Sequence, residues 1–186
     1  MNLQTAAIAE VAEMSPEALA LMRPGINPLD YVALLMERRQ YPDAVRFVAH
    51  ALPKREAVRW AWMCARRAAG ENPRPEVRAS LAATQQWIDQ PSDENRRAAM
   101  DAAEAADLGT AAGCAGLGAF FSGDSLGSAG APPVPPGDYL PAKAVSGAVI
   151  YAAICGEPER APEKFRSFIS QGVDVANRIH IWTGEQ

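Results

Sequence analysis

One serine flanked by glycines has the residue types and spacing of a catalytic nucleophile. The segment Gly123-Asp124-Ser125-Leu126-Gly127 fits the pattern G-x-S-x-G, in which a serine on a sharp turn after a buried strand attacks an acyl carbon. Such a serine needs a base within hydrogen-bond reach, and His180 is the only histidine that follows it. Ser125 and His180 together therefore define one hypothesis, a serine hydrolase or esterase.

The sequence around Ser125 favours a simpler interpretation. The segment also resembles the Gly-Asp-Ser-Leu nucleophile block of a family of lipases and esterases, in which an aspartate lies three residues before the histidine. Here Asp174 lies six residues before His180, and residues 110–121 carry alanine and glycine at helical spacing where a strand is needed. We therefore expect Ser125 on a helix-to-loop exit, far from His180.

The sequence contains no recognisable motif for binding a metal or a cofactor. The spacings H-x-x-x-H, E-x-x-H and C-x-x-C, which bring metal ligands together locally, are absent. Phosphate-binding and dinucleotide-binding glycine patterns are absent as well. Cys64, Cys114 and Cys155 lie in apolar stretches and are expected to pack as small hydrophobic residues. The sequence predicts no cofactor and no metal.

Arginine is concentrated in one part of the chain. Residues 38–67 contain eight basic and two acidic residues, in a protein whose net charge is −4. This segment either neutralises the acidic segments that pack beside it or binds the acidic surface of another protein, since guanidinium groups match carboxylates well. The residues predicted to contact such a partner are Arg38, Arg39, Arg46, Arg55 and Arg59, with Trp60 or Trp62 as an aromatic anchor.

The two tryptophans cannot both serve this surface. Trp60 and Trp62 are two residues apart, so they point to different sides of a helix. We expect core positions for both, with one of them partly exposed or at a contact. Nucleic acid is not expected as a partner, because the pI of 5.3 opposes binding to phosphates and no DNA-binding motif is present.

Helix start and stop signals divide the chain into eight or nine short helices. Ser15-Pro16 and Asn27-Pro28 each combine an N-cap residue with a proline in the first turn. Apolar residues recur at helical spacing from residue 29 to residue 176, and only residues 179–182 resemble a strand. The prediction is an all-α fold, either a compact bundle or a short solenoid-like array. It forms a single domain over residues 1–186, with a possible subdivision into 1–121 and 139–186.

Residues 122–138 interrupt the helical pattern with glycine, serine and proline. Residues 132–136 read Pro-Pro-Val-Pro-Pro and contain P-x-x-P twice, which favours the polyproline II conformation. We interpret this segment first as a stiff connector and second as a ligand for a proline-reading domain. The glycines of residues 110–121 would let neighbouring helices approach closely.

Targeting and membrane signals are not found. The first 22 residues contain three glutamates and no lysine or arginine, unlike a secretory signal. The longest apolar stretch, residues 144–155, is too short to cross a membrane. An odd number of cysteines suits a reducing compartment, so we expect a cytoplasmic protein without a membrane span.

From Leu81 onward, the sequence resembles an uncharacterised family of bacterial all-helical proteins, a domain of unknown function. The resemblance covers roughly residues 81–178. It is carried by Trp87-Ile88, Pro91-Ser92, Arg97-Ala98-Ala99, residues 119–126, the double proline and the alanine-rich residues 141–155. The resemblance implies a helical fold and no established activity. Some relatives lie near bacterial secretion-system genes, which implies an accessory role.

Three hypotheses follow. The first is a non-enzymatic adaptor, chaperone or accessory protein that binds another protein with an acidic surface, in connection with a secretion system. The second is the hydrolase that uses Ser125 with His180. The third is a purely structural helical domain of a larger assembly. The oligomeric state is not predicted.

Overall fold

The computed structural model describes residues 3–128 and 130–182, and this part of the chain is all-helical. The elements are α1 (Leu3–Val11), α2 (Pro16–Leu19), α3 (Pro28–Glu37), α4 (Tyr41–Ala51), α5 (Lys54–Ala69), α6 (Pro75–Asp89), α7 (Asp93–Ala105), α8 (Ala111–Phe121), α9 (Leu140–Ile154), the 3-10 turn η1 (Pro158–Arg160) and α10 (Ala161–Arg178). Nine of these described helices are longer than two turns. The structure confirms the all-α prediction.

Side-chain caps begin several helices where the sequence predicted them. The Ser15 hydroxyl oxygen accepts the N–H of Ala18 at 3.1 Å, and the Asn27 side-chain oxygen accepts the N–H of Asp30 at 2.9 Å. Each bond satisfies an amide that has no partner inside its own helix. At the other end of α5, Gly70 has a φ of 70° and ends the helix.

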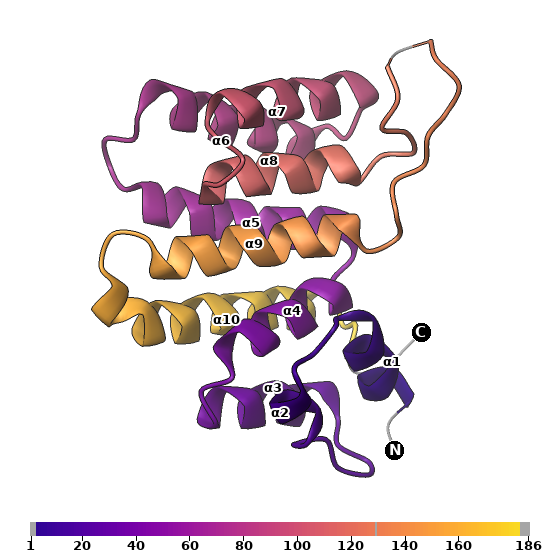
Figure 1. The fold of residues 1–186 in the computed structure, drawn as a ribbon, viewed down its shortest axis with the longest axis vertical. Coiled ribbons are helices and arrows are strands. Elements are labelled where there is room, and N and C mark those ends of the chain that lie inside the picture. The colour runs from indigo at the N-terminus through magenta and orange to yellow at the C-terminus, as the bar shows by residue number, and fades with distance from the viewer. Residues whose placement is uncertain (1–2, 129, 183–186) are drawn as a thin grey trace.

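The helices stack as layers along the long axis of the molecule (Figure 1). The helices α6, α7 and α8 lie at one end, α5 and α9 lie in the middle, α10 and α4 follow, and α1 to α3 form the other end. Although α9 comes late in the chain, it packs against α8, α5, α4 and α10. Such contacts between elements distant in sequence make a compact bundle, and a solenoid-like array would lack them. A continuous cluster of buried residues runs from Ala9 on α1 to Ala176 on α10.

Close helix contacts depend on the glycines of α8, as their spacing predicted. A Cβ atom on Gly116 would lie 2.9 Å from both the Cβ of Ala103 and the carbonyl oxygen of Ala99 on α7. A Cβ on Gly118 would lie 3.3 Å from Val145 on α9. The backbone of α8 therefore lies directly against its neighbours.

Two local features differ from the expectation that the sequence gives rise to. The sequence pattern does not predict α1, because its residues are rich in alanine and have no clear apolar face. Residues 179–182 form a turn and not a strand. The carbonyl of Ile181 accepts a hydrogen bond from Gln4 of α1 at 2.9 Å, so this turn joins the two ends of the described chain. None of the described helices is both long and apolar enough to span a membrane.

Candidate functional site

Ser125 lies in the loop that leaves α8, four residues after the last helical residue, as predicted. Its hydroxyl oxygen accepts the N–H of Gly127 at 3.1 Å and the N–H of Val134 at 3.0 Å. The turn that contains His180 follows α10 and lies near α1, whereas the loop after α8 projects from the opposite end of the molecule (Figure 1). The structure therefore does not bring Ser125 and His180 together, and the Ser125 oxygen serves as an acceptor for the loop backbone.

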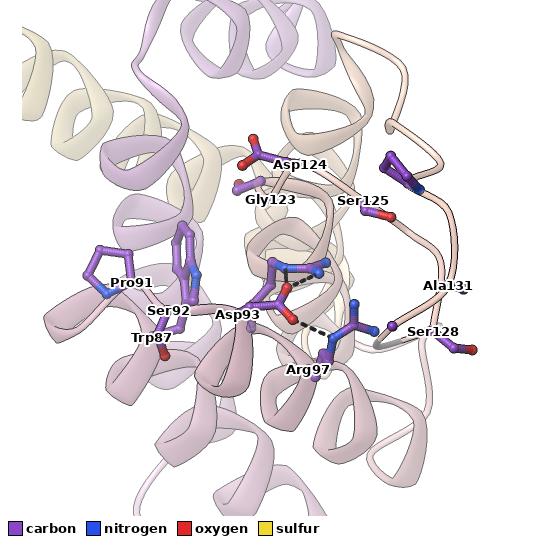
Figure 2. Close-up of a pocket in the computed structure, with 14 residues that line it drawn as sticks. Trp87, Pro91, Ser92, Asp93, Arg97, Gly123, Asp124, Ser125, Ser128 and Ala131 are labelled. Carbon is purple, nitrogen blue, oxygen red and sulfur yellow. Dashed lines mark hydrogen bonds and ion pairs between the residues drawn. The ribbon is translucent and has the colours of Figure 1, made fainter.

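A pocket of about 540 Å³ lies between this loop and the start of α7. Figure 2 shows Asp93 at its centre, joined to Arg97, with Asp124 and Ser125 on the loop side. The Asp93 carboxylate pairs with both Arg96 and Arg97, and the hydrogen bonds from Arg97 and then Arg96 hold the pKa of Asp93 below its usual range. No histidine is among the described residues that line this pocket.

Both arginines of this pocket hold the loop in place. Arg96 is buried, donates a hydrogen bond to the carbonyl of Phe120 at 2.9 Å and lies over the Phe120 ring at 4.7 Å. Arg97 donates to the carbonyl of Gly127 at 2.8 Å. A Cβ atom on Gly123 would overlap the Arg96 side chain, so a larger residue at this position would have to displace Arg96. The pocket is thus built around groups that fasten the loop to α7.

Trp60 is not available as a partner anchor, which corrects one of the residues predicted from the sequence. Its side chain is fully buried, and its indole N–H donates to the carbonyl of Phe168 on α10 at 2.8 Å. The physical reason is packing: Gly172 of α10 lacks a side chain, and an added Cβ there would lie 2.8 Å from the Trp60 ring. Trp60 is therefore a core residue.

The predicted arginines fall into two separate groups. Arg38 and Arg39 are exposed after α3, and Arg46 on α4 pairs with Asp43 at 3.4 Å. Arg55 and Arg59 lie on α5, in a different layer of the molecule (Figure 1). The predicted arginines are thus divided between the α3–α4 region and α5.

On α5, the contacts of the predicted arginines are local. Arg59 pairs with Glu56 of its own helix at 3.3 Å. Arg55 donates to the carbonyl of Ile88 at 2.7 Å and to that of Asp89 at 3.3 Å, which caps the end of α6. Within the described residues, the ion pair of Arg59 therefore stays inside α5, and Arg55 binds backbone carbonyls and no acidic side chain.

Trp62 marks a groove that the structure builds between three helices. Its indole N–H donates to the carbonyl of Leu81 on α6 at 2.9 Å, which fixes the ring in the seam between α5 and α6. Trp62, Arg66 and Gly70 line two adjoining hollows of about 630 and 380 Å³. We call both hollows together the Trp62 groove; its other main lining residues are Met63, Arg67, Arg78, Leu81 and Gln171.

Three arginines of the Trp62 groove carry uncompensated charge. Arg66 lies over the Trp62 ring at 5.4 Å, and Arg67 donates to the hydroxyl of Ser167 at 2.7 Å. Among the described residues, none of Arg66, Arg67 and Arg78 forms an ion pair. Glu71 is the acidic residue among those that line the groove. The groove thus combines a half-buried aromatic floor with an excess of positive charge.

The sequence pattern could have identified part of this groove. Arg55, Arg59, Trp62 and Arg66 follow the spacing i, i+4, i+7 and i+11, which places them on one helix face. Arg78 and Gln171 come from α6 and α10. Only the tertiary structure brings those two residues to Trp62.

Comparison with known proteins gives a family for most of the chain. Residues 31–176 match the Family of unknown function (DUF6931). The chain belongs to this family. The part of the chain that matches the family runs from α3 to α10 and includes both the Trp62 groove and the loop after α8. Neither the curated proteins nor the solved structures contain a match to the chain.

Proposed function

We propose that this protein is a non-enzymatic adaptor that binds an acidic segment of another protein in the Trp62 groove. The observation that carries the proposal is a cluster of three arginines around a half-buried indole, none of which forms an ion pair within the described residues. Protein interfaces draw most of their binding energy from such tryptophan and arginine anchors. We place this activity in the cytoplasm, the reducing compartment that three free cysteines favour.

The chemistry of the groove specifies the partner. Carboxylates of the partner would pair with Arg66, Arg67 and Arg78, whose guanidinium groups offer two parallel donors. An apolar residue of the partner would cover the open part of Trp62 and Met63. A role as a secretion-system accessory would be one setting for this function, and it rests on the resemblance alone.

Some of the arginines in the Trp62 groove also stabilise their own helix, and the test must separate this effect from partner binding. Arg66 and Arg67 lie in the last turn of α5, where cations stabilise the negative end of the helix dipole. Arg78 lies in the first turn of α6, where a cation has no such benefit. Charge reversal at position 78 therefore tests binding with little cost to the helix.

The experiment uses a fluorescein-labelled 12-residue peptide of alternating glutamate and leucine, with a lysine-for-glutamate peptide as the charge control. We expect the protein to bind the glutamate peptide, and Arg66→Glu with Arg78→Glu to weaken binding by about tenfold or more. The matched control is Arg23→Glu with Arg178→Glu, two exposed arginines outside the groove that change the net charge equally. Anisotropy titrations at several salt concentrations measure the affinity. Equal loss in both double variants would indicate a general charge effect and contradict the proposed site.

A further inference from the structure

The proline run, residues 132–136, is exposed in the loop after α8 and takes no part in the Trp62 groove. It reads Pro-Pro-Val-Pro-Pro, and the described segment has no helix or turn. Proline fixes its own φ, and it also drives the residue before it to extended conformations. The run is therefore biased toward polyproline II by its covalent structure.

The Ser125 hydroxyl and the loop backbone hold the proline run in one position. Val134 has the only N–H group in the run, and it donates to Ser125 Oγ at 3.0 Å. The carbonyl of Val134 accepts the N–H of Leu126 at 2.7 Å. Arg97 on α7 fastens the same part of the loop through the carbonyl of Gly127. The serine that resembles a nucleophile thus positions the proline run.

These bonds use only Val134 and leave most of the proline run exposed, with Pro136 half-buried. The side chain of Val134 is 54% exposed, and Pro132, Pro133 and Pro135 are also exposed. Within the described residues, the carbonyls of Pro133 and Pro135 accept no hydrogen bond. Exposed proline rings and free carbonyls are the groups that aromatic grooves bind, through ring packing and tryptophan or tyrosine donors.

We propose that the proline run is a preformed recognition segment for a partner domain with an aromatic, proline-reading groove. Fixing a ligand in its bound conformation lowers the entropic cost of association. The run projects from the opposite side of the molecule to the α5–α6 connection that borders the Trp62 groove (Figure 1). An adaptor with these two surfaces would hold an acidic partner and a proline-reading partner at the same time.

The test titrates the full chain with three purified proline-reading domains, one each of the SH3, WW and EVH1 types, by isothermal calorimetry. We expect at least one domain to bind the wild-type chain. Pro133→Ala with Pro135→Ala removes one proline from each P-x-x-P pair, and it should weaken that binding about tenfold or more. The matched control is Pro24→Ala with Pro158→Ala, two exposed prolines elsewhere, which should leave the affinity unchanged.

A second variant tests whether the fixed conformation of the proline run contributes to binding, in addition to the prolines themselves. Ser125→Ala keeps every proline but removes the acceptor of the Val134 N–H, so it should weaken binding about threefold or more while circular dichroism stays unchanged. Binding by none of the three domains, or equal binding by the wild-type and Pro133→Ala/Pro135→Ala chains, would overturn the proposal. The glutamate peptide should bind all these variants as it binds the wild type, so the two proposals fail independently.

Discussion

At the scale of single residues, polar side chains that look reactive serve as fasteners for the backbone. Ser125 accepts two loop N–H groups, and Arg96 connects α7 to the carbonyl of Phe120 in the last turn of α8. His50 follows the same principle, because its Nδ1 lies 2.8 Å from the carbonyl of Arg46 and must carry the proton of that hydrogen bond. Its other nitrogen, Nε2, is buried and has no hydrogen-bond partner within the described residues.

The environment of His50 predicts a pH dependence of stability. Burial lowers the pKa of His50, and nearby Lys143 and Arg46 act in the same direction, against the bond to the Arg46 carbonyl and the charge of Glu13. The unfolded chain then binds a proton at His50 more readily than the folded chain does. The free energy of unfolding should therefore be highest above about pH 6.5 and decrease as the pH falls below this value. Urea unfolding between pH 7.5 and pH 5.5 measures this effect. His50→Gln should reduce the slope, and an unchanged slope would assign the pH dependence to other groups.

At the scale of the helices, the sequence predicts where elements begin more reliably than how they pack. Ser15, Asn27 and Ser92 act as N-caps because the capping bond reaches only three residues along the chain. The burial of Trp60 and the contact of Arg55 with α6 depend on residues 33 or more positions away. A local sequence pattern does not show which distant residues pack together. The sequence therefore could not distinguish the buried Trp60 from exposed residues, or the arginines that bind neighbouring helices from those that are free to bind a partner.

The close contact between α7 and α8 predicts that a glycine-to-alanine substitution changes the stability of the protein in opposite directions at two positions. Alanine normally stabilises a helix by about 1 kcal/mol relative to glycine. Gly116→Ala should instead destabilise the protein by about 1–3 kcal/mol, because the new methyl group would overlap Ala103 and the Ala99 carbonyl. Gly147→Ala on α9 is the control, since its Cβ would meet only Cys114 Sγ at an ordinary 3.4 Å, and it should be neutral or stabilising. The unfolding temperatures of both variants, compared with that of the wild type, test this prediction. Stabilisation by both substitutions would contradict it and show that α8 can move away from α7.

At the scale of the whole molecule, the all-α class and the helix order follow from the sequence, whereas the binding surfaces follow only from the fold. The basic segment 38–67 is continuous in sequence, but the structure divides its arginines between the α3–α4 region and α5, and of those on α5 only Arg66 and Arg67 line the Trp62 groove. The groove gains Arg78 from α6 and Gln171 from α10, which no spacing along α5 could reveal. The layered bundle then separates this groove from the proline run.

The central claim, that a partner occupies the Trp62 groove, is tested most directly by photo-crosslinking inside the cells that make the protein. A photoreactive amino acid replaces Ala82, which is exposed and lines the groove, or Ala98, an exposed control on α7. Mass spectrometry then identifies the partner peptide. The account predicts a peptide rich in aspartate and glutamate that is captured from position 82, is absent from position 98, and is lost when Arg66→Glu and Arg78→Glu are added. Capture of the same peptides from both positions, or capture that survives charge reversal, would contradict it.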